Sequence, residues 1–211
     1  MDTFTGIPAA AMAFYAELEE NNNREWWLEH KDVYDGAVRG PLETLFAGLE
    51  PEFGPAKIFR PNRDIRFSAD KSPYKTAQGA FAANHEGLGY YLQISADGLL
   101  VGAGCHSYSP AQLARYRSAV DAPVSGVELA DVVDAVAQAG FRIEGEMLKT
   151  VPRGFDKEHP RAELLKHKSL SAAVMLGQPG WMDSPAAQGE VAALWTQLRP
   201  LVEWMAAHAA P

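Results

Sequence analysis

The densest group of chemically versatile side chains in this sequence lies in its first half. Residues 60–74 read RPNRDIRFSADKSPY, with three arginines, two aspartates, a lysine and a tyrosine. From Lys57 to Lys75 there are six basic side chains and two acidic ones, a local charge of +4, whereas the whole chain carries a formal net charge of −8. A cationic cluster in an acidic protein is typical of a binding site for an anionic group.

The residue types in this cluster suit a phosphorylated ligand. Arginine presents a planar fork that matches phosphate or carboxylate, lysine adds a point charge, and tyrosine offers a hydroxyl donor or a stacking face. We therefore predict binding of a phosphorylated small molecule or a nucleotide. The residues expected to contact it are Arg60, Arg63, Arg66, Lys71, Tyr74 and Lys75.

The two carboxylates inside the cluster are candidate catalytic residues. Asp64 lies between Arg63 and Arg66 and could orient one guanidinium, and Asp70 could act as an acid, a base or a metal ligand. Carboxylates so close to cations should stay ionised, which favours an orienting role over that of a general acid. The sequence does not reveal a reaction, so whether the protein is an enzyme stays open.

A second cluster lies in residues 149–160, on a stretch that contains proline and glycine. Its cations are Lys149, Arg153 and Lys157. This loop could close over the first cluster, or it could be an exposed loop in which acidic and basic side chains alternate. His159 is a further candidate catalytic base, and the alternative is that it caps or braces the next helix.

Two other functions fit the same residues. In one, the cationic groove binds the end of a nucleic-acid strand, although a pI near 5.2 makes this less favoured than a small ligand. In the other, the arginines and aspartates only brace the fold, and residues 70–74 form a turn with local hydrogen bonds. In each case we expect Phe67 to be a core residue.

Composition predicts one globular domain over residues 1–211. The chain is 47% hydrophobic and has no apolar run near the roughly 20 residues of a membrane span, so we expect a cytoplasmic protein that does not contact membranes. The single cysteine, Cys105, excludes an intramolecular disulfide, and the six histidines lack metal-ligand spacing. We predict no metal and no cofactor; the oligomeric state is not indicated.

Hydrophobic periodicity predicts an α+β fold, with a largely antiparallel sheet flanked by N-terminal and C-terminal helices. Expected helices are 7–18, one capped by Asn23, one after Gly40-Pro41, one opened by Ser109-Pro110, 128–139, 161–167 and one from Ser184-Pro185. Expected strands are 57–67, interrupted by a bulge or turn at Pro61-Asn62 and with Ile65 and Phe67 on one face, then 79–83, 89–95, 99–104, 141–146 and 169–176, with a hairpin at Asp97-Gly98.

The sequence also resembles a known family. The string R-x-x-R-D-x-R-F-x-x-D-K-x-x-Y at 60–74, the segment NNNREWW at 21–27 and the segment KTVPRGFDKEHP at 149–160 are similar to an uncharacterised, mostly bacterial family, domain of unknown function 2461. The resemblance covers most of the chain. It implies a single-domain protein of similar length, and it implies no reaction.

Overall fold

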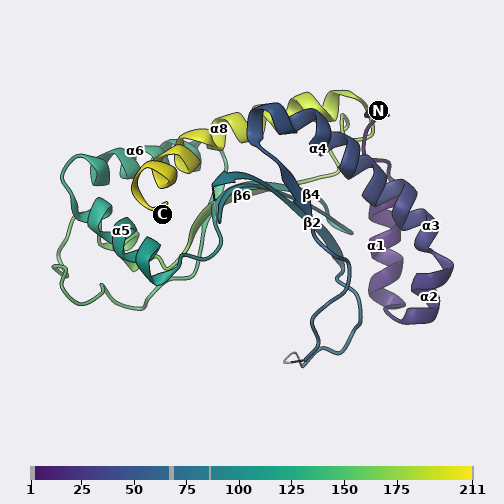
Figure 1. Cartoon of the computed structure of the whole chain (residues 1–211), viewed down its shortest axis with the longest axis horizontal. Coiled ribbons are helices and arrows are strands. Elements are labelled where there is room, and N and C mark those ends of the chain that lie inside the picture. The colour runs from purple at the N-terminus through teal and green to yellow at the C-terminus, as the bar shows by residue number, and fades with distance from the viewer. Residues whose placement is uncertain (1–2, 67–68, 86, 211) are drawn as a thin grey trace. The chain divides into compact units, whose positions relative to one another are not determined.

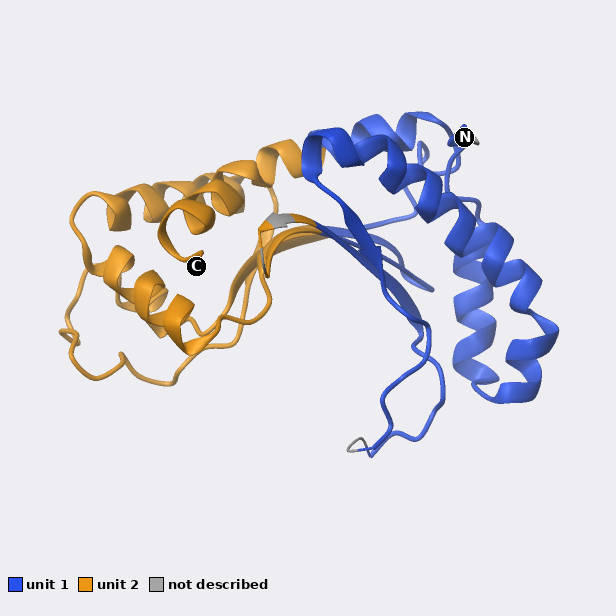
Figure 2. Ribbon diagram, viewed as in Figure 1, with its two compact units in different colours: residues 1–82, 91–101, 175–193 blue, residues 83–90, 102–174, 194–211 orange. Residues whose placement is uncertain are grey.

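The structure is a computed structural model that describes residues 3–66, 69–85 and 87–210, without the side chain of Asn84. Its contacts divide the chain into two compact units (Figure 2). The first contains residues 1–82, 91–101 and 175–193, and the second contains residues 83–90, 102–174 and 194–211. The expectation of a single domain stays a prediction.

The described residues form one six-stranded sheet in the order β1-β2-β3-β4-β6-β5. Strands β2, β4 and β6 of this sheet are labelled in Figure 1. Pairing is antiparallel where β1 meets β2 and where β5 meets β6. The predicted β3–β4 hairpin is present, but it turns at Ala96-Asp97, one residue before the predicted Asp97-Gly98. The strands are β1 (Ala56–Ile58), β2 (Ala77–His85), β3 (Leu88–Ser95), β4 (Gly98–Cys105), β5 (Arg142–Glu144) and β6 (Leu170–Gly177). The predicted α+β class is confirmed.

Helices of the first unit follow one another almost without interruption. They are α1 (Ala10–Glu20), α2 (Arg24–Glu29), α3 (Lys31–Val33), the π-helix η1 (Tyr34–Arg39) and α4 (Gly40–Phe53). Asn23 caps α2 as predicted, because its side-chain oxygen accepts a hydrogen bond of 3.0 Å from the Trp26 amide. Pro41 occupies the first turn of α4.

Helices of the second unit start close to the predicted residues, except that the helix expected over 128–139 begins at Ser125. They are α5 (Pro110–Asp121), α6 (Ser125–Gln138) and α7 (Ala162–Lys166), and α8 (Ala186–His208) runs through both units. Ser109 and Gln112 form a reciprocal capping box at the start of α5. Gly140, with φ of +96°, follows the end of α6.

Side chains of the sheet alternate between two faces in the first unit. On one face they are fully buried, as at Ala80, Leu92 and Ile94. On the other face, which we call the open face, side chains remain partly exposed, and Lys57 lies in register with Phe81. The open face holds Lys57, Phe59, Phe81, Tyr91, Gln93 and Leu100.

The strand predicted over 57–67 is wrong for most of its described length. Strand β1 ends at Ile58, and the chain then runs irregularly to the single bridge at Asn62. Pro61 has no N–H to donate to a ladder, and Ile65 is 38% exposed, so alternation there does not reflect a buried face. Phe67, predicted to be a core residue, lies outside the described residues.

Trp26 and Trp27 differ in their surroundings. Trp27 is buried, whereas Trp26 is half-buried and stacks on His30 with ring centres 4.0 Å apart. Val33, further along the same helical segment, is exposed.

Within the described residues, no helix combines the length and the apolar character that crossing a membrane requires.

His167 in the second unit should make stability depend on pH. It is buried, its Nδ1 lies 2.9 Å from the Ser169 carbonyl oxygen, and burial lowers its pKa from the usual 6.5. The unfolded state therefore takes up the proton first, so the stabilisation is complete above about pH 6.5 and decreases as the pH falls below it. Urea unfolding between pH 5 and 7.5 should show this slope, and His167→Gln should flatten it. An equal slope in the variant would contradict the assignment.

Candidate functional site

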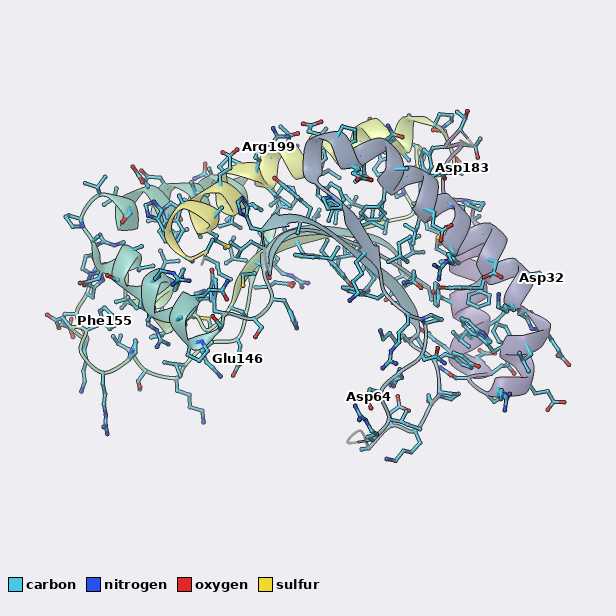
Figure 3. The ribbon with its side chains drawn as sticks, viewed as in Figure 1. Asp32, Asp64, Glu146, Phe155, Asp183 and Arg199 are labelled. Carbon is cyan, nitrogen blue, oxygen red and sulfur yellow. The ribbon has the colours of Figure 1, made fainter. Side chains whose placement is uncertain are left out.

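Residues 59–76, which we call the basic loop, carry the first cluster and are closed at their base by backbone hydrogen bonds. The Arg63 amide donates to the Pro73 carbonyl at 2.9 Å, and the Lys75 amide donates to the Pro61 carbonyl at 2.8 Å. Asn62 and Tyr74 form an antiparallel bridge between these bonds. The loop is therefore a hairpin-like projection, and Asp64 lies towards its far end (Figure 3).

Helix α2 and the turn before it hold one side of the basic loop. The Asn22 side chain donates to the Tyr74 carbonyl at 3.0 Å and accepts from the Tyr74 amide at 3.1 Å. The Tyr74 ring stacks on Trp27 with ring centres 4.1 Å apart and an angle of 10° between the planes. Tyr74, predicted as a ligand contact, is a buried anchor of the loop.

A buried amide holds the other side of the loop's base. Gln78 donates through Nε2 to the Phe59 carbonyl at 2.7 Å and to the Gly79 carbonyl at 2.9 Å. Its Oε1 accepts a 2.7 Å hydrogen bond from the hydroxyl of Tyr34, the first residue of η1. Burial raises the pKa of Tyr34, which keeps this hydroxyl a donor. Neither Gln78 nor Asn22 was predicted from the sequence, because Tyr34, which binds Gln78, and Tyr74, which binds Asn22, are distant along the chain.

Both aspartates of the basic loop are paired with arginine. Arg66 binds Asp64 through two side-chain hydrogen bonds of 3.0 and 2.7 Å, and Arg63 forms an ion pair with Asp70. The hydrogen bonds from Arg66 lower the pKa of Asp64, and those from Ser72, with the charge of Arg63, lower the pKa of Asp70. Both pKa shifts favour the ionised carboxylate, in agreement with the prediction.

The other cations of the basic loop have different surroundings. Lys71 donates to the Ile65 carbonyl at 2.9 Å, and Lys75 donates to the Arg60 carbonyl at 3.1 Å. Within the described residues, neither Arg60 nor Lys75 forms an ion pair with a carboxylate. Burial, and then the charge of Arg60, lowers the pKa of Lys75. Arg60 and Lys75 therefore form a pair of like charges.

The second cluster belongs to the second unit, so the two clusters are described separately. Lys149, Arg153 and Lys157 are exposed, on the long loop where Figure 3 labels Phe155. Among the described side chains of this loop, these three have no ion-pair partner. The expectation that this loop closes over the first cluster stays a prediction.

His159 has both ring nitrogens engaged. Its Nδ1 accepts a 3.0 Å hydrogen bond from the Arg161 amide, and its Nε2 lies 3.3 Å from an Asp121 carboxylate oxygen. The ring therefore links the start of α7 to the end of α5, which fits the bracing role that was the alternative to catalysis. Arg161, not singled out in the sequence, donates to the carbonyls of Val120 and Asp121 at 2.7 and 3.0 Å and thereby caps α5.

Cys105 and the described acidic groups offer no further chemistry. The Cys105 thiol is fully buried, and burial raises its pKa to about 11, so it is a poor nucleophile at neutral pH. Among the described residues, no group of three or more histidine, cysteine, aspartate or glutamate side chains is placed to hold a metal ion. The basic loop therefore remains the candidate site.

The fold and this site define an α+β protein with an anchored cationic loop. Residues 10–204 match the model of the conserved hypothetical protein family DUF2461, and the chain belongs to this family. No curated protein and no solved structure matches the chain.

Proposed function

We propose that this protein binds a phosphorylated small molecule or nucleotide through the basic loop. The observation that carries the proposal is the pairing of Arg60 with Lys75. The charges of these two cations repel each other, and neither cation has a carboxylate partner among the described residues. An anion bound between them would interact favourably with both charges.

The anchoring of the loop supports the same proposal. Asn22 and Trp27 hold Tyr74, the residue directly before Lys75, and Gln78 holds Phe59, the residue directly before Arg60. The backbone at both cations is thus fixed before a ligand arrives, which reduces the ordering cost of binding.

Isothermal titration with inorganic phosphate and with ribose 5-phosphate tests the proposal. We expect Arg60→Gln and Lys75→Gln each to weaken binding about tenfold to a hundredfold, because a hydrogen bond to a charged group contributes about 1.5–3 kcal/mol. Arg142→Gln, which removes an exposed cation in the second unit, is the charge-matched control and should bind like the wild type. Absence of binding, or equal losses in all three variants, would refute the proposal.

The other cations support a bracing role alongside binding. Arg63 and Arg66 are each engaged by an aspartate, so we assign them to the shape of the loop, with Asp64 and Asp70 as orienting groups. Recognition of a nucleic-acid end is the alternative, and it predicts affinity that falls steeply with salt. A cytoplasmic location stays part of this proposal.

A further inference from the structure

Two aromatic rings lie beside each other on the open face of the sheet, next to the basic loop. The ring centres of Phe59 and Tyr91 are 6.4 Å apart, and the planes are tilted by 32°. Both side chains are partly exposed. Rings placed side by side on a strand surface form a surface on which a planar group can stack.

Gly79 determines how the Tyr91 ring lies. A Cβ atom at Gly79 would be 2.5 Å from the Tyr91 hydroxyl oxygen and 3.0 and 3.1 Å from Cε2 and Cζ. The ring therefore lies over the position where any other residue would have a side chain. The hydroxyl donates to Gln93 Oε1 at 2.8 Å, which fixes the ring in this position.

The cation pair of the basic loop borders this aromatic surface. Lys75 Nζ lies 5.8 Å from the centre of the Phe59 ring and donates to the carbonyl of Arg60. Arg60 follows Phe59 directly in the chain. The charge of Lys75 therefore lies over the Phe59 ring, and a ligand that suits both the rings and the cation is planar at one end and anionic at the other.

We propose that the open face binds a free nucleotide, with its base stacked on Phe59 and Tyr91 and its phosphate at Arg60 and Lys75. This inference rests on the proposed function and specifies its ligand class. A free nucleotide fits better than a long strand, because the chain has a net charge of −8 and the cations that border the rings are few.

Competition calorimetry with AMP, GMP, CMP and UMP against ribose 5-phosphate tests the base site. At least one nucleotide should bind about tenfold to a hundredfold more tightly than ribose 5-phosphate, the gain expected from stacking one base. Tyr91→Leu should remove this gain and leave affinity for ribose 5-phosphate unchanged, whereas Tyr91→Phe, which keeps the ring, should retain it. Phe59→Leu gives a second test if Tyr91→Leu does not fold.

The possible outcomes separate this inference from the proposed function. Equal affinity for the nucleotides and ribose 5-phosphate would overturn the inference while anion binding stands. If neither binds, the proposed function fails and the inference fails with it. A single-stranded oligonucleotide that binds far more tightly than any nucleotide, with steep salt dependence, would also overturn the inference, because the ligand would then be a strand.

Discussion

Replacing Trp27 with alanine should lower the free energy of unfolding by about 3–5 kcal/mol, the usual cost of truncating a buried tryptophan. Trp27 is 6% exposed and contacts the rings of Phe14, Tyr34 and Tyr74. The loss should reach the basic loop as well, since the stacked Tyr74 ring loses its support. Urea unfolding measures the first effect, and amide hydrogen exchange at Tyr74 and Lys75 measures the second.

Trp26→Ala is the matched control for this variant. It removes the same side chain from the same helix, but Trp26 is half-buried and stacks on His30 at the surface. We expect a loss of about 1 kcal/mol and no change in exchange at the basic loop. Asn22→Ala adds a complementary test, because it removes the two hydrogen bonds to Tyr74 without touching the stack. Equal exchange in the wild type and Trp27→Ala would show that α2 does not hold the loop.

Gly98→Ala should destabilise the protein by about 3 kcal/mol or more, because two separate costs add at this position. Gly98 has φ of +109°, a conformation that an alanine adopts only with strain. Its Cβ would also lie 2.1 Å from the Gly177 carbonyl oxygen, where β4 and β6 are neighbours in the sheet. The obstructing atom is backbone, so strands β4 and β6 must separate to admit the methyl group.

Gly140→Ala separates the two costs. Gly140 has φ of +96°, but no atom lies within 4 Å of the position of its Cβ. Its substitution therefore measures the conformational cost alone, about 1–2 kcal/mol. The expected order of stability by chemical denaturation is wild type, then Gly140→Ala, then Gly98→Ala. Equal losses in the two variants would show that the contact with Gly177 has no energetic effect.

Features set by near neighbours in the chain were predictable from the sequence. Asn23 and Ser109 cap helices as expected, because the amides they bind lie three residues further on. The β3–β4 hairpin formed within one residue of the predicted position, because Gly98 permits the positive φ directly after the turn at Ala96-Asp97. The α+β class follows from such elements taken in order, and the family was predicted from the motifs. Within the cluster, the pairing of Asp64 with Arg66 was also a local interaction, two residues apart.

The sequence did not identify which residues of the cluster anchor and which stay available. Tyr74 is held by Asn22, 52 residues away, and Gln78 by Tyr34, 44 residues away. Such contacts depend on how α2, η1 and β2 pack against one another, and a pattern of neighbouring residues in the sequence does not predict that packing. The strand predicted beyond Ile58 is absent for a related reason, since polar and apolar residues alternate there although the chain has no buried face.

The sequence alone determined the charge of the basic loop, and it determined the helix caps and the β3–β4 hairpin of the protein. Only the tertiary structure decided that Lys75 lies over the Phe59 ring and that Phe59 lies beside Tyr91, because strand register and long-range hydrogen bonds set that arrangement.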